Sequence, residues 1–147
     1  VTITKKVVGD MGDTTKNFSF TATLDTTQIR QGSAYTTAGD GAALTDTGFT
    51  LRSGGSVTLT HLRADQTLTL TETDPGDHTV SWQLNGDDGP TGATCTIQVP
   101  RTQPAEITCI NTRNVGIPTG LHTGAAPYLA LVGLCWLGWR LLRCREV

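Results

Sequence analysis

Residues 68–82 read LTLTETDPGDHTVSW, a run of alternating apolar and polar residues that contains one turn sequence. Leu68, Leu70 and Glu72 alternate with threonines, and a period of two is the repeat of side chains along a β-strand. The tetrapeptide DPGD at 74–77 then carries the chemistry of a tight turn, and a second strand-like run follows at 78–84. A short strand, a turn and another short strand predict an all-β domain.

Similar runs recur throughout residues 1–112, with turn clusters between them. They predict strands at 1–8, 17–25, 47–51, 56–61, 67–73, 78–84, 92–99 and 105–112. Residues 26–46 are polar and less regular, and we expect one helical turn at Thr27–Arg30. Because no long helical pattern separates the strands, the sequence predicts an antiparallel β-sandwich.

Three of these strands carry a polar residue on their apolar face. Lys5 shares the face of Ile3, Glu72 that of Leu70, and Asn111 that of Ile107. The parities therefore place Lys5, Glu72 and Asn111 in the core, and they place the neighbouring Lys6 on the outer face. A lone buried amine or carboxyl costs several kcal/mol, so the two are expected to meet. The residues alone leave open whether they form a buried ion pair or a reactive set.

Charge and composition exclude several classes of function. The net charge is −2 at pH 7, and no basic cluster precedes the last eight residues, so we expect no nucleic-acid partner. We find no nucleophile–base arrangement, and no Cys or His spacing matches a zinc site. We therefore expect neither an enzyme nor a bound metal or cofactor. The chain begins at Val1 without a methionine, which indicates a fragment or a processed product.

The chain changes character after residue 112. Residues 113–124 form a linker rich in Gly, Pro and Thr, and residues 125–142 are nearly all apolar. Eighteen helical residues would rise about 27 Å, close to the thickness of a hydrocarbon core. We expect a single transmembrane helix at 125–142 and a basic cytoplasmic tail at 143–147.

Four segments together resemble a known family. VTITKKVVGDMGD (1–13), FSFTATL (18–24), LTLTETDPGDHTVSW (68–82) and ITCINTRNVGIPTG (107–120) are similar to the isopeptide-forming pilin and adhesin domains of Gram-positive surface proteins. That group comprises Cna B-type and streptococcal pilin domains. The resemblance covers nearly the whole chain, and it implies an Ig-like, Cna B-type β-sandwich at 1–112.

The resemblance also implies a covalent bond. In this group a lysine of the first strand joins an asparagine of the last strand through a side-chain amide, assisted by an acid of a middle strand. By position these residues would be Lys5, Asn111 and Glu72. The chemistry suits them, because burial favours the neutral amine that can attack and the neutral acid that can polarise the carboxamide oxygen. The result would be a single crosslinking event without turnover.

The linker contains a second implied signal. Ile117-Pro118-Thr119-Gly120, followed by an apolar stretch and arginines, resembles the Leu-Pro-any-Thr-Gly sorting signal that sortase transpeptidases cleave. Here isoleucine replaces leucine, and the residue between proline and threonine is missing. The resemblance implies a sortase as a partner, with attachment to peptidoglycan or to another pilin subunit. Without cleavage, the helix would hold the chain in the membrane.

Cys95 and Cys109 lie in the last two predicted strands, which we expect to form a hairpin around Thr102. Both share the parity of apolar neighbours. They could form a cross-strand disulfide in an oxidising exterior, or they could be two small buried thiols.

These observations predict a membrane-proximal stalk domain of a Gram-positive cell-surface adhesin or pilin, with the β-domain outside the cell. The alternative is a ligand-binding adhesin module that uses the 26–46 region as a recognition loop. A host ligand could also bind through upstream domains.

Overall fold

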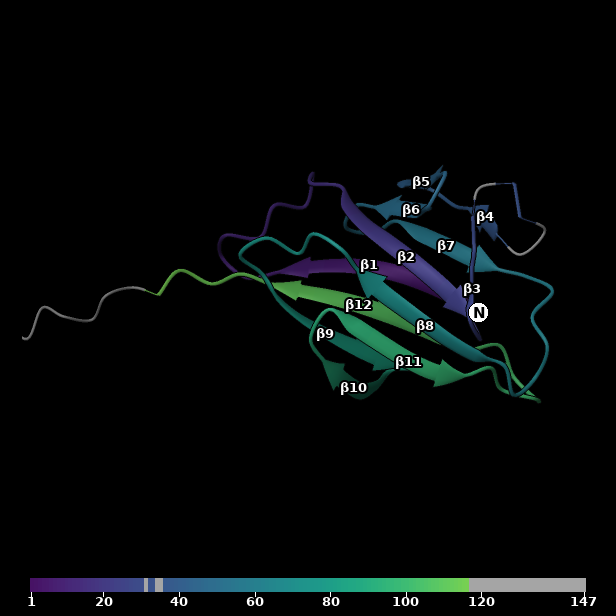
Figure 1. Ribbon diagram of the computed structural model, residues 1–147. Coiled ribbons are helices and arrows are strands. Elements are labelled where there is room, and N and C mark those ends of the chain that lie inside the picture. Colours follow the sequence, from purple (N-terminus) through teal and green to yellow (C-terminus); the bar gives the residue numbers. More distant parts are fainter. Residues whose placement is uncertain (31, 34–35, 117–147) are drawn as a thin grey trace, which may run out of the picture. The chain divides into compact units, whose positions relative to one another are not determined.

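The computed structural model describes residues 1–30, 32–33 and 36–116, which fold into two layered β-sheets (Figure 1). Val1–Val115 forms one compact unit. Within the described ranges every regular element is a strand, so the predicted all-β sandwich is confirmed for them.

The first sheet contains β1 (Thr2–Val8), β4 (Thr36–Ala38), β7 (Ser56–Leu59), β9 (Thr79–Leu84), β10 (Asp87–Thr91) and β12 (Glu106–Thr112). Its strand order is β10-β9-β12-β1-β7-β4. The second sheet contains β2 (Phe18–Leu24), β3 (Thr27–Gln28), β5 (Ala42–Thr45), β6 (Gly48–Leu51), β8 (Thr67–Glu72) and β11 (Thr94–Gln98). Its order is β11-β8-β2-β6-β5, and β3 pairs with β2.

The core consists of the inward-facing residues of these strands. In β8, Leu68 and Leu70 are buried while the threonines between them are only partly buried, as the alternation predicts. On the outer face, the Thr69 hydroxyl lies 3.2 Å from that of Thr96 on β11. Hydroxyl pairs of this kind stabilise neighbouring antiparallel strands. The largest apolar side chains that are fully buried include Trp82, Phe18, Phe49, Ile3, Leu51, Leu59, Leu68, Leu70 and Ile107.

The first and last strands of the sandwich, β1 and β12, are neighbours at the centre of the first sheet and run parallel (Figure 1). Among the described residues, every other strand pair is antiparallel. The expectation of a wholly antiparallel sandwich is therefore wrong at this one pair. No tight turn connects β1 to β12, and the long intervening chain lets them align in parallel.

The region 26–46 is more regular than its polar sequence indicates. The expected helical turn at Thr27–Arg30 is wrong, because Thr27 and Gln28 form β3 and pair with Leu24 and Thr23 of β2. Asp25 makes this hairpin possible with a left-handed backbone (φ 54°). Strands β4 and β5 complete the region at sheet edges.

The segment 85–90 is only partly the turn that its Asn, Gly and Asp residues indicate. Asn85 (φ 53°) and Gly86 (φ 89°) form a two-residue turn that is typical of hairpins, with Leu84 paired to Asp87. Residues from Asp87 onward then form β10. As an edge strand, β10 tolerates Pro90, and its register shifts between Asp88 and Thr91.

The predicted hairpin around Thr102 is also wrong. Strand β11 pairs with β8 in the second sheet, whereas β12 pairs with β1 and β9 in the first. The chain crosses between the sheets at this point, and Cys95 and Cys109 therefore lie in different sheets. Both are free cysteines, so the structure contains buried thiols in place of a cross-strand disulfide.

Candidate functional site

The three polar residues that the alternation places in the core lie together there. Lys5 and Asn111 are 0% exposed and Glu72 is 1% exposed, while the neighbouring Lys6 is exposed. Lys5 and Asn111 lie on the adjacent strands β1 and β12, where Lys5 is in register with Cys109 and Asn111 with Val7. Glu72 ends β8 in the opposite sheet, so the site bridges the two layers of the sandwich.

One carboxylate oxygen joins the three side chains. Lys5 Nζ donates to Glu72 Oε1 at 3.1 Å, and Asn111 Nδ2 donates to the same oxygen at 2.8 Å. The carboxylate therefore holds the amine nitrogen and the amide nitrogen next to each other. Since all three side chains are buried, this contact is shielded from solvent.

The carboxamide of Asn111 is oriented differently from the expected arrangement, in which Glu72 contacts its oxygen. Here the amide nitrogen faces Glu72 Oε1. A carboxyl oxygen that carries no proton accepts hydrogen bonds, and the N–H groups of Lys5 and Asn111 are both directed to Oε1. In this orientation Glu72 contacts the nucleophile and the group that would leave.

Cys109 is a fourth member of the site, and strand parity alone assigns it no role there. Its Sγ accepts a hydrogen bond from Lys5 Nζ at 3.3 Å and lies 3.5 Å from Glu72 Oε2 and 3.9 Å from Asn111 Oδ1. Burial raises the pKa of the Cys109 thiol to about 12, with Glu72 adding to the increase and Lys5 opposing it. Its shared parity with Asn111, two residues away on the same strand, is the signal that could have identified it.

Aromatic rings enclose the amine. Lys5 Nζ lies 4.5 Å from the centroid of the Phe18 ring and 5.5 Å from that of Phe20. Both rings are buried. The Phe20 and Trp82 rings pack edge to face, with their centroids 6.4 Å apart. These rings exclude water from Lys5, and they would attract its cationic form.

The arrangement is suited to one reaction, the transfer of the Asn111 acyl group to the Lys5 amine. A nucleophile, an acyl donor and a proton-carrying group are held in contact by the fold, which removes the translational cost of bringing them together. The same contacts could also make a static buried ion pair with a hydrogen-bonded amide. Only the acyl transfer changes the covalent structure.

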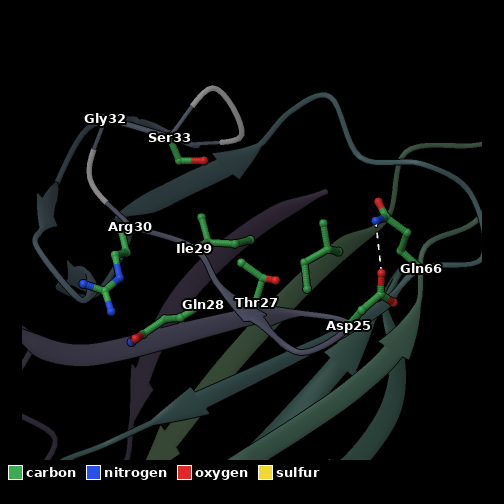
Figure 2. Close-up of a pocket in the computed structure, with 9 residues that line it drawn as sticks. Asp25, Thr27, Gln28, Ile29, Arg30, Gly32, Ser33 and Gln66 are labelled. Carbon is green, nitrogen blue, oxygen red and sulfur yellow. Dashed lines mark hydrogen bonds between the residues drawn. The ribbon is translucent and has the colours of Figure 1, made fainter.

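A separate hollow of about 440 Å³ lies in the 26–46 region, where a recognition loop is the alternative prediction. Figure 2 shows Asp25, Gln28, Arg30 and Gln66 among its lining side chains, and Gln66 Nε2 donates to Asp25 Oδ2 at 3.1 Å. The described lining residues include no aromatic side chain, the usual anchor of a protein-binding site. The hollow therefore adds no specific support for a ligand-binding module.

Two predicted features lie outside the described residues: the sorting-like motif Ile117–Gly120 and the membrane helix at 125–142 with its basic tail. In the part of the chain that the structure describes, no helix is long and apolar enough to cross a membrane.

Comparison with known proteins identifies relatives of the chain. Residues 1–113 match the model of a family described as a domain of unknown function, DUF7601. A pilin from Streptococcus pyogenes serotype M1 is 28% identical over 149 residues, which span 89% of this chain and 44% of the pilin. The chain thus spans less than half the length of this relative.

Solved structures share the fold. The major pilin of Streptococcus pyogenes superposes with a TM-score of 0.56 at 24% identity, over 78% of this chain and 47% of that one. A pilus-presented adhesin, Cpa, gives 0.55 at 25% identity, over 78% and 27% of the two chains. An adhesin from Mobiluncus mulieris, described as containing intramolecular disulfide, isopeptide and ester bond crosslinks, gives 0.51 at 18% identity, over 76% and 39%. The resemblance to Gram-positive pilin and adhesin domains is confirmed.

Proposed function

The chain belongs to the DUF7601 domain family, and from its similarity to a pilin and its buried polar cluster we propose that it is a structural stalk domain of a Gram-positive cell-surface pilin or adhesin. The similarity to pilins and pilus adhesins supports a location at the cell surface and association with other pilin subunits. In this proposal the domain resists force and proteolysis, and it is crosslinked once by its own residues.

The observation that carries the proposal is the contact of Lys5 and Asn111 through one oxygen of Glu72. The Lys5 amine attacks Asn111 Cγ, the Nζ–Cγ bond forms and the Cγ–Nδ2 bond breaks. Glu72 accepts a proton from the amine and delivers it to the departing nitrogen, which leaves as ammonia. The product is an amide between the first and last strands, with Glu72 regenerated.

The position of the bond suits a mechanical role. Because β1 and β12 are parallel neighbours, the start of β1 and the end of β12 lie at opposite ends of the pair (Figure 1). A force that pulls on both ends of the domain would therefore shear these two strands past each other. A covalent bond between Lys5 and Asn111 would carry that force directly, without loading the rest of the sandwich.

Intact mass tests the proposal. We expect the folded wild-type chain to be one ammonia lighter than its sequence mass, and Glu72→Ala to restore the full mass because no group remains to move the proton. The exposed Thr73→Ala, at the next residue, should keep the lighter mass. A wild-type chain with its full sequence mass would refute the crosslink.

The proposal extends to the anchor. The motif Ile117–Gly120 would direct a sortase to cleave between Thr119 and Gly120 and to join Thr119 to peptidoglycan or to another pilin subunit. We expect a mature form that ends at Thr119 when the chain is produced with a sortase in a Gram-positive host, and none after Thr119→Ala. Recovery of the wild-type chain from membranes with residues 143–147 still attached would argue for a membrane anchor instead.

A further inference from the structure

The oxygen of the Asn111 carboxamide is where negative charge would develop during the proposed attack. Among the described residues, the Cys109 thiol is the hydrogen-bonding group that the structure places on this Oδ1, at 3.9 Å. Glu72 contacts the other end of the same amide. We propose that Cys109 is a fourth catalytic residue of the crosslinking site, which orients the Lys5 amine and donates its S–H to the developing oxyanion on Asn111; this inference rests on the proposed function.

Cys109 orients the amine through its sulfur. A neutral amine has two N–H groups and one lone pair. One N–H of Lys5 is directed to Glu72 Oε1 at 3.1 Å and the other to Cys109 Sγ at 3.3 Å. With both hydrogens held, the lone pair remains available for the carbonyl carbon of Asn111.

The thiol is held in the form that the role needs. Burial, the main cause, raises the pKa of Cys109 to about 12, so the sulfur stays protonated at neutral pH. A protonated thiol is a hydrogen-bond donor and a poor nucleophile. Cys109 therefore does not compete with Lys5 for the Asn111 carbonyl.

The S–H changes its partner during the reaction. Before attack, Sγ is closer to Glu72 Oε2 (3.5 Å) than to Asn111 Oδ1 (3.9 Å). As the Nζ–Cγ bond forms, charge on Oδ1 makes it the stronger acceptor, and rotation about the Cβ–Sγ bond turns the S–H toward it. When ammonia leaves, the carbonyl reforms and the proton remains on sulfur throughout.

The rate of crosslinking tests this role. The full chain is labelled in a short pulse of synthesis, quenched in acidic denaturant at intervals, and scored by intact mass for the fraction that has lost one ammonia. We expect Cys109→Ala to crosslink at least about tenfold more slowly than wild type. The decrease in rate should be smaller than the roughly 10²–10³-fold seen when a strong oxyanion donor is removed, because a thiol is a weak donor. Cys109→Ser, which keeps a donor, should be faster than Cys109→Ala.

Two further variants separate chemistry from packing. Cys109→Val fills the space without a donor and should crosslink as slowly as Cys109→Ala. If the alanine variant does not fold, the comparison of Cys109→Val with Cys109→Ser tests the role instead. Cys95→Ala removes the buried thiol of the other sheet, opposite Leu70, and should keep the wild-type rate.

The outcomes distinguish this inference from the function on which it rests. Crosslinking of Cys109→Ala or Cys109→Val at the wild-type rate, or of Cys109→Ser as slowly as Cys109→Val, would overturn the role of Cys109 and leave the crosslink intact. A wild-type chain that never loses ammonia would overturn both.

Discussion

Lys5→Ala is expected to lower the free energy of unfolding by more than about 4 kcal/mol. Without Lys5 no bond can form, and the crosslink closes a loop of more than a hundred residues. In the chain-entropy model, which was developed for disulfides, constraining a loop of this length in the unfolded state contributes about 4–5 kcal/mol. The variant also leaves the buried Glu72 carboxyl without its hydrogen-bond partner on Lys5 Nζ, which adds to the loss.

Denaturant unfolding of wild type and variant measures this difference, with intact mass recorded for each. Lys6→Ala is the matched control: it removes the exposed lysine next in the chain and should change stability by no more than about 0.5 kcal/mol. Equal stabilities of Lys5→Ala and Lys6→Ala would contradict the prediction.

A double replacement separates the two contributions. Lys5→Met with Glu72→Leu removes the bond and the buried carboxyl together, and replacing both partners of a buried hydrogen bond by apolar groups of similar shape can be nearly neutral. This variant should lose only the part that loop closure contributes. If it is as unstable as Lys5→Ala, the crosslink accounts for the whole effect and the buried carboxyl for none.

Trp82→Ala is the second change with a large expected effect, a loss of about 3–5 kcal/mol in the free energy of unfolding. Trp82 is 1% exposed and lies on β9, in register with Cys109 on β12. Its ring packs edge to face with that of Phe20, and its Nε1 donates to the carbonyl of Gly92 at 2.8 Å. Truncation would leave a cavity between the sheets and remove this hydrogen bond.

Thermal and denaturant unfolding measure this loss. Trp82→Phe should lose less, because it keeps an aromatic ring and removes only the hydrogen bond and part of the volume. Met11→Ala, at a side chain that is 51% exposed, should stay within about 0.5 kcal/mol of wild type. A Trp82→Ala chain as stable as Met11→Ala would show that the contact between β9 and the second sheet is not central to the core.

The strands that the sequence predicts well are those with a strong alternation. Each predicted range contains a strand of the structure, and in β8 the predicted boundary differs by one residue. The strands β3, β4, β5 and β10 were not predicted, because they are short and lie at sheet edges or in hairpins, where no long alternation develops. Asp87–Thr91 also contains Gly and Pro, which favour turns in isolation.

The candidate site was predicted in part for the same reason. Alternation along a single strand is a local property, and it correctly placed Lys5, Glu72 and Asn111 inside and Lys6 outside. The chemical role of these three residues stays a prediction. Cys109 was assigned to the apolar face but not to the site, since parity gives the side of a strand and not the neighbours across it.

Alternation along the strongly patterned strands therefore predicts which of their side chains are buried, because burial follows from a repeat of two residues. Which of these side chains meet follows from how the strands pair. The parallel pairing of β1 with β12 brings Lys5 into register with Cys109, and the separation of β11 from β12 places the two cysteines in different sheets. Strand order and direction depend on contacts between residues far apart in the chain, and no local pattern of residues encodes them.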